Sequence, residues 1–326
     1  MIDITPKLKE RFCKDCNIPL KIYEEPYFTD RLKLYDLFYQ SIHKWNVFKS
    51  ELKKYHCEQD YFEEYNCIKD QAINDIKNTD AYQRFNQEDM NQYSIKYVGL
   101  PSKDIFKPSN DNKLFISIDM KKANFSALRY YDKNIFRGTQ TWEQFIGFYT
   151  NNHHIINSKY IRQVILGNCN PKRHITYEKY LMDQVLDCLI REVGFWVNEV
   201  VFFSNDEIVI DMENYADCIK NRDIIQKILE EHFEFPLKTE LFYLHKVNGT
   251  QGYCKEIVEN LVDRSFQFKC LDSYMLPFVM RYMLNEDITE NDKVFIHEGM
   301  LAKYIEIPKI EVSLSELYRN QNQSSG

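Results

Sequence analysis

The sequence predicts an α+β protein whose middle part, residues 113–247, is built from an antiparallel sheet and helices. Three observations lead to this prediction. The run LFISID at 114–119 is short and apolar, ends in a carboxylate and has the length of a buried strand. Apolar residues spaced by four between Tyr177 and Val193 give the clearest amphipathic helix of the chain. Two apolar arms at 200–211 surround a polar tip, as in a β-hairpin.

Further elements complete this middle part. We expect helices around Trp142–Tyr149 and from Lys159 to Cys169, and Pro171 ends or kinks the second of them. One apolar face between Ile224 and Leu229 predicts another helix, and PLKTELFYLHKV at 236–247 predicts another strand. The order is then βαββαβ, the split arrangement in which the first strand and the hairpin lie side by side.

The residues before the sheet, 1–112, predict a helical lobe and a linker. Apolar positions recur every three or four residues from Tyr35 to Leu52, which indicates one helix with a buried face. A second helical stretch is expected from Phe62 to Phe85. Two Pro and a Ser-Asn-Asp-Asn cluster at 100–113 are turn and linker chemistry, so we expect a domain boundary there.

The residues after the sheet, 248–320, predict a smaller third lobe. We expect a helix near Lys255–Val262, an apolar stretch at 271–284 and several short strands. The polar end of the chain, 321–326, is expected to be disordered.

Composition excludes several classes of protein. A net charge of −7 argues against indiscriminate coating of nucleic acid, although basic residues gather between 157 and 181. No run of apolar residues is long enough to cross a membrane, and the N-terminus lacks a secretion signal. Nine cysteines without a framework spacing predict an intracellular, reducing compartment, the cytoplasm or the nucleus. Cys13 and Cys16 have the spacing of half a zinc site, but no second half follows.

Two carboxylates carry the predicted chemistry. The expected topology brings Asp119, at the end of the first strand, next to Asp206 at the hairpin tip. Two neighbouring carboxylates repel each other unless a cation lies between them, and oxygen ligands suit Mg²⁺. Taken singly, Asp119 could cap a helix and Ser204–Glu207 could be an ordinary turn. Taken together, the two residues favour a metal site.

The segment Asp119–Leu128 resembles motif A of family B DNA polymerases, an Asp followed by a few residues and then by an aromatic-Pro-Ser and two aliphatic residues. Here Phe125 stands where that family has Pro. Phe203–Ile210 is similar to motif C. Its Asn-Asp-Glu core is closer to the His-Asp-Glu of family A enzymes, while its position matches the Asp-Thr-Asp of family B, whose first Asp is Ser204 here.

The segment Lys159–Arg162, followed by Gly167 and Asn168, resembles the motif B helix, in which a basic residue contacts the triphosphate. The Tyr-Gly that follows in the families is absent. The motifs occur in the order A, B, C. The resemblance implies a polymerase-type palm between the helical N-terminal lobe and a C-terminal thumb-like lobe.

The resemblance also implies residue roles. Asp119 and Asp206 would bind Mg²⁺ or Mn²⁺, and Glu207 would lie next to the primer terminus or share a metal. Asn124 or Phe125 would lie under the incoming sugar. The triphosphate would meet polar and basic side chains of the following segment, namely Lys159, Arg162, Asn168, Lys172 and Arg173. A solvated basic helix face is the alternative for this last group.

The predicted reaction is metal-dependent transfer of a nucleotide from an NTP or dNTP to the 3′-hydroxyl of a nucleic acid. Partners would be a primer and template or a tRNA-like acceptor, and the chain could be a subunit of a larger complex. Two alternatives remain open. One is a reverse-direction tRNA-repair polymerase, similar to tRNA-His guanylyltransferase, or a cyclase on the same palm. The other is a catalytically inactive, palm-like subunit that binds nucleic acid or assists assembly.

Overall fold

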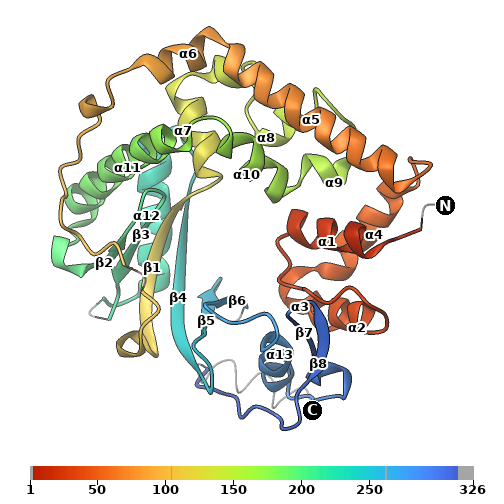
Figure 1. Cartoon of the computed structure of the whole chain (residues 1–326). Helices are drawn as coiled ribbons and strands as arrows, with labels where there is room; N and C mark the ends of the chain where they lie inside the picture. The colour runs from red at the N-terminus through yellow and green to blue at the C-terminus, as the bar shows by residue number, and fades with distance from the viewer. Residues whose placement is uncertain (1–2, 104, 214, 261–262, 315–326) are drawn as a thin grey trace. The chain divides into compact units, whose positions relative to one another are not determined.

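The computed structural model describes residues 3–103, 105–213, 215–260 and 263–314 (Figure 1). Within these ranges the protein is α+β, with thirteen α-helices and an antiparallel sheet of seven strands. The chain divides into two compact units. Unit 1 comprises Met1–Gln83, Asn134–Cys169 and Leu271–Ile310, and unit 2 comprises Arg84–Lys133, Asn170–Cys270 and Glu311–Gly326. The tail expected to be disordered, 321–326, lies outside the described residues.

Unit 1 is mainly helical, with one two-stranded sheet. Its elements are α1 (Pro6–Asp15), α2 (Tyr27–Leu34), α3 (Asp36–Tyr39), α4 (Ser41–Leu52), α5 (Glu58–Asn78), α8 (Trp142–Ile146), α9 (His153–Ile156), α10 (Lys159–Gly167), α13 (Leu276–Leu284), β7 (Val294–His297) and β8 (Met300–Lys303). The helix α6 (Asp80–Gln87) crosses the division between the units. The helices predicted near Trp142 and from Lys159 are therefore confirmed.

The prediction of a single helix from Tyr35 to Leu52 is wrong, because the helix is interrupted at Gln40. Gln40 adopts a left-handed conformation with φ of 52°, which ends α3 and precedes α4. A left-handed residue cannot continue a right-handed helix. The periodic face itself is buried at both ends, at Tyr35 and at Leu52.

The helix predicted from Phe62 to Phe85 is also divided, at Thr79. This residue is extended, with φ of −72° and ψ of 137°. Its hydroxyl accepts a hydrogen bond from the backbone N–H of Tyr82 at 3.1 Å. Thr79 therefore ends α5 and caps the N-terminus of α6, as short hydroxyl side chains commonly do.

Unit 2 contains the large sheet and the helices that cover it (Figure 1). Its elements are β1 (Lys113–Met120), α7 (Ala123–Tyr131), α11 (Pro171–Cys188), β2 (Val200–Phe203), β3 (Glu207–Asp211), α12 (Cys218–His232), β4 (Leu237–Asn248), β5 (Tyr253–Val258), β6 (Arg264–Lys269) and β9 (Glu311–Val312). A π-helical turn, Leu189–Val193, continues α11 until Gly194. The strands, hairpin and helices predicted over this range are present.

Pro171 begins a helix instead of kinking one. The helix α10 ends at Gly167, and Pro171 is the first residue of α11. Proline is favoured at this position, because the first N–H of a helix has no acceptor within the helix.

The sheet has the strand order β2-β3-β1-β4-β5-β6, and β9 pairs with β4. All these pairs are antiparallel, so β1 lies between β3 and β4. The helices α11 and α12 pack against β3 and β4 (Figure 1). Ile116 and Ile118, which share one face of β1, are fully buried, as expected where helices cover the sheet.

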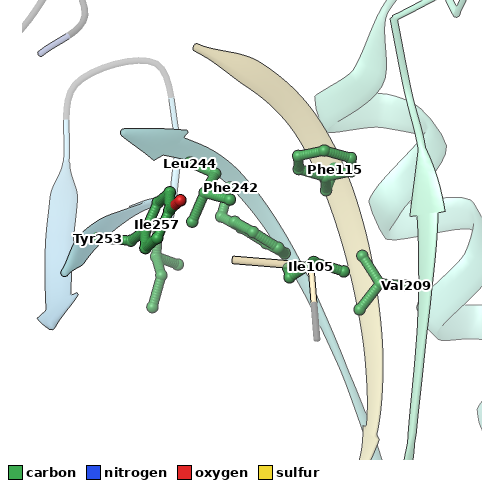
Figure 2. Close-up of a cluster of buried hydrophobic side chains, with 7 residues drawn as sticks. All are labelled: Ile105, Phe115, Val209, Phe242, Leu244, Tyr253 and Ile257. Atoms are coloured by element: carbon green, nitrogen blue, oxygen red, sulfur yellow. The ribbon is translucent and has the colours of Figure 1, made fainter. Parts of the chain in front are cut away.

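The other face of the sheet has an apolar end and a polar end. Figure 2 shows the apolar end, where Ile105 from the segment before β1 lies among side chains of four strands. These are Phe115, Val209, Phe242, Leu244, Tyr253 and Ile257. Side chains alternate along a strand, so Phe115 shares its face with Ser117 and Asp119. The polar end of this face therefore begins two residues from the apolar cluster.

The helix expected near Lys255–Val262 is wrong, since residues 253–258 form the strand β5. Every residue of β5 is buried, and the strand pairs with β4 on one side and β6 on the other. A strand buried on both faces lacks the alternation that identifies a half-exposed strand. Leu261 and Val262 lie outside the described residues.

Within the described ranges, no helix combines the length and the apolar character needed to cross a membrane. No disulfide bond occurs among these residues.

Candidate functional site

Asp119 lies near the end of β1, at a point where residues of three neighbouring strands lie side by side. In the antiparallel ladders it is directly opposite Glu207 of β3 and Lys238 of β4. Residues directly opposite each other point to the same face of a sheet. The backbone N–H of Met120 donates to the carbonyl of Asp206 at 2.8 Å, so the hairpin tip lies beside the end of β1. The structure thus brings Asp119, Asp206 and Glu207 together.

The hairpin tip is ordered by the hydroxyl of Ser204. This hydroxyl accepts hydrogen bonds from the backbone N–H of Glu207 at 2.9 Å and of Asp206 at 3.2 Å. It donates in turn to Oδ1 of Asp206 at 3.0 Å. Ser204 therefore holds the turn that presents Asp206.

Glu207 is held from the neighbouring strand. Ser117 of β1 donates its hydroxyl hydrogen to Oε1 of Glu207 at 2.5 Å. Ser117 itself is fully buried beneath the polar end of the face. A neutral hydroxyl orients this carboxylate without cancelling its charge.

The electrostatics at Asp119 favour its protonated form. Burial raises the pKa of Asp119 to about 7, and three neighbouring carboxylates add to this effect. These are Glu207, Asp206 and Glu240, whereas the ammonium group of Lys255 acts in the opposite direction. The site therefore has more negative charge than its own cations balance.

Two lysines compensate Glu240. Lys255 of β5, which is nearly buried, donates to Oε2 of Glu240 at 3.1 Å, and Lys238 bonds to Oε1. Burial acts to raise the pKa of Glu240, but these two lysines hold it below its ordinary value. Lys255 also lies over the ring of Phe242, 4.2 Å from its centroid.

Glu178 of α11 is a site residue that the sequence analysis did not assign. Its side chain has 0% exposure, and it accepts hydrogen bonds from two amides. Asn124 Nδ2 donates to Oε1 at 2.5 Å, and Asn205 Nδ2 donates to Oε2 at 2.7 Å. Burial raises the pKa of Glu178 to about 7, the two amides oppose this, and the charge of Asp206 adds to it.

A sequence signal for Glu178 exists. On α11 it precedes Met182 by four residues and Val185 by seven, and both are completely buried. An acid at these spacings lies on the apolar face of its helix. Acids are almost never fully buried without partners, so this position predicts polar groups beneath the helix.

The two residues expected near the sugar have different surroundings. Asn124 lies in the first turn of α7 and is held by Glu178. Phe125 is only 4% exposed, so its ring belongs to the packed interior of unit 2.

The predicted triphosphate contacts divide between the units. Lys159, Arg162 and Asn168 belong to unit 1, so their assignment to a ligand at Asp119 stays a prediction. Asn168 caps α10 by donating to Val164 O at 2.8 Å, and burial lowers the pKa of Arg162.

Lys172 and Arg173 belong to unit 2, at the start of α11. Arg173 donates to the carbonyl of Phe85 at 2.6 Å from Nη2, and to that of Glu88 at 2.6 Å. These bonds tie α11 to the end of α6. Lys172 is exposed.

Asp119 and Asp206 offer carboxylate oxygens, the type of donor that hard divalent cations prefer. Within the described ranges, no group of three or more His, Cys, Asp or Glu side chains is arranged to hold a metal ion. A cation here would therefore take part of its shell from water or substrate oxygens, as Mg²⁺ commonly does.

The chain matches no protein-family model, no curated protein and no solved structure.

Proposed function

We propose that unit 2 contains a polymerase-type palm and that the protein is a metal-dependent nucleotidyltransferase. It would add nucleotides from an NTP or dNTP to the 3′-hydroxyl of a nucleic acid. The observation that carries this proposal is the meeting of Asp119 with Asp206 and Glu207 at one end of β1 and β3.

The strand order supports the proposal. In β2-β3-β1-β4, the hairpin lies on one side of β1, and the strand after α12 lies on the other. The helices α11 and α12 contact this sheet, while Asp119 shares a face with the apolar cluster that contains no helix residue. In this proposal, a substrate would bind at the polar end of the second face. Flanking helical and thumb-like lobes, 1–112 and 248–320, belong to the same proposal, although β5 and β6 of the second range extend the sheet.

The chain's own residues would hold and orient the reacting groups. A bound Mg²⁺ or Mn²⁺ supplies charge that activates an attacking hydroxyl and stabilises a leaving pyrophosphate. Asp119 and Asp206 would ligate the ion, and Ser117 orients Glu207 beside them. Lys255 and Lys238 balance Glu240 and so limit the negative charge that an incoming triphosphate meets.

A second candidate is a palm-like subunit that binds nucleic acid without catalysis. Its support is that Asp206 and Glu207 each accept a hydrogen bond from a serine hydroxyl, Ser204 and Ser117 respectively. Carboxylates with such partners can be stable without a metal.

Nucleotide incorporation tests the two candidates. The wild-type protein is incubated with labelled triphosphates and Mg²⁺ or Mn²⁺ on primed DNA, primed RNA, tRNA or no acceptor. We expect incorporation by the wild type and a fall of about a hundredfold or more in Asp206→Asn, the scale of losing one electrostatic contact to a transition state. Asp211→Asn is the matched control, because Asp211 lies at the opposite end of β3.

The products separate the remaining possibilities. Incorporation that survives Asp206→Asn would refute the assignment of this residue. No incorporation on any acceptor, together with binding of nucleic acid, would favour the non-catalytic subunit. Addition to the 5′ end of tRNA would indicate the reverse-direction enzyme, and a cyclic product without acceptor would indicate a cyclase.

A further inference from the structure

Glu178 connects the two turns that present the carboxylates of the site. Asn124 follows Asp119 by five residues, in the first turn of α7, and Asn205 directly precedes Asp206 at the hairpin tip. Both side-chain amides donate to the same carboxylate, one to each oxygen. We call these three residues, Asn124, Glu178 and Asn205, the amide cluster.

The cluster joins three elements that are distant in sequence. Glu178 belongs to α11, which packs against α7 and β3. The backbone bond from Met120 to Asp206 fixes one point between β1 and the hairpin. The amide cluster adds a second connection through α11, so the turn at Asp206 is held from two sides.

A purely structural role would not require a charged group here. Within the described part of the chain, no Lys, Arg or His pairs with Glu178, and the charged group that acts on it is Asp206, of the same sign. Burying a carboxylate with only neutral donors is costly. A glutamine has the same shape without that cost, but it offers one acceptor oxygen where the cluster uses two.

We propose that Glu178 is a positioning residue that sets the separation of Asp119 and Asp206 by holding Asn124 and Asn205 at once. This inference rests on the proposed function, because the separation matters only if the two carboxylates share a cation. Glu178 contacts neither the cation nor the substrate in this scheme. Its effect is transmitted through Asn205 to Asp206 and through Asn124 to the turn that follows Asp119.

Direct binding of Mn²⁺ to the full chain, measured by electron paramagnetic resonance, tests the inference without relying on turnover. We expect Glu178→Gln to weaken Mn²⁺ binding about tenfold, the size of effect seen when groups that orient metal ligands are removed. Thermal unfolding should show that the variant is folded and no less stable than the wild type.

Asp183→Asn is the matched control. Asp183 is a second buried acid of α11 and also accepts two N–H groups, from Lys96 and Tyr97, both at 2.9 Å. It lies outside the amide cluster, so its substitution should leave Mn²⁺ binding unchanged.

A mutant cycle separates positioning from a simple loss of charge. If Glu178 acts through the two asparagines, then adding Glu178→Gln to Asn124→Ala/Asn205→Ala weakens Mn²⁺ binding no further. A further weakening would overturn the inference, because it would show that the charge of Glu178 acts on the cation independently of the amide cluster.

Two other results would contradict the inference, and they differ in what they imply for the proposed function. If Glu178→Gln binds Mn²⁺ with wild-type affinity while Asp206→Asn loses Mn²⁺ binding, then the role of Glu178 is refuted and the proposed function stays in place. No saturable Mn²⁺ binding by the wild type would refute both. If Glu178→Gln does not fold, then Asn205→Ala and Asn124→Ala disturb the cluster without changing α11. Wild-type affinity in both would then refute the inference.

Discussion

Burial and neighbouring negative charge determine the ionisation of two carboxyl groups in unit 2. The pKa of Asp119 and the pKa of Glu178 are both raised to about 7, and in each case burial is the largest cause. The additional causes differ. Asp119 is repelled by three carboxylates, whereas Glu178 is repelled by Asp206 and is partly compensated by two amides. Both groups therefore change their ionisation near neutral pH.

The stability of the metal-free protein should depend on pH through Glu178. Its pKa rises from 4.5 in the unfolded chain to about 7 in the folded protein, so the folded protein binds the extra proton between these values. The contribution is complete below pH 4.5 and is lost as the pH rises through about 7. The free energy of unfolding should fall over this range by an amount of the order of 3 kcal/mol.

Urea unfolding in the presence of a chelator, at several pH values from 4.5 to 8, measures this dependence. Glu178→Gln removes the titrating group, so its curve should be flatter than that of the wild type. The pH dependence that remains in this variant would come from Asp119, whose pKa is also raised in the folded protein. Parallel curves for the two proteins would contradict the assignment of a buried, protonatable Glu178.

At the level of the elements, single residues decide where the predicted helices end. The apolar periodicity runs without interruption from Phe62 to Phe85, and α5 and α6 both bury residues of that pattern. The break between them depends on Thr79, whose hydroxyl bonds forward to Tyr82 N and whose own hydrogen is donated to Ile76 O. Periodicity reports which residues are buried, and it does not report a change of backbone direction.

Thr79→Ala should lower the free energy of unfolding by about 1 kcal/mol, because α6 loses the acceptor at its N-terminus. Thr79→Ser keeps the hydroxyl and should recover most of this loss. Chemical denaturation of the three proteins gives the comparison. Equal stability of the alanine and serine variants would show that the hydroxyl does not stabilise α6.

At the level of the whole molecule, acidic residues outnumber basic ones, and several acids lie together at the candidate site. The chain carries a net charge of −7, and one end of β1, β3 and β4 gathers Asp119, Glu207 and Glu240. Lys238 and Lys255 are engaged with Glu240, and Lys255 only partly offsets the repulsion that Asp119 experiences. Repulsion between these carboxylates lowers the stability of the free protein, and under the proposed function a bound cation would relieve it.

Mg²⁺ should therefore reverse the order of thermal stability of the wild type and the variant Asp119→Asn. With a chelator, Asp119→Asn should melt at a higher temperature than the wild type, because the variant removes a buried, repelled charge. Saturating Mg²⁺ should raise the melting temperature of the wild type by several degrees and leave the variant unchanged. A ligand at 100 times its Kd stabilises the folded state by about 2.7 kcal/mol. An equal shift in both proteins would indicate non-specific binding.

The sequence was sufficient wherever one element could be recognised from its own residues. The strand ending at Asp119, the hairpin around Asp206, the strand from Leu237 and the helix α11 all have a complete local pattern. The strand β5 could not be recognised in this way, because both of its faces are buried and its six residues show no alternation. The break at Gln40 could not be recognised either, because the spacing of apolar residues does not reveal a left-handed backbone.

The local pattern of the sequence was enough to predict β1, β2, β3 and β4 and the two carboxylates beside their ends, Asp119 and Asp206. The surroundings of those carboxylates follow from the tertiary structure. Glu178 approaches from α11, Lys255 from β5, and Glu240 from β4. Local periodicity depends on neighbours three or four residues away, whereas burial, repulsion and hydrogen bonding at this site come from residues separated by tens of positions. Packing brings these groups together, so their pKa values and their partners follow from the fold.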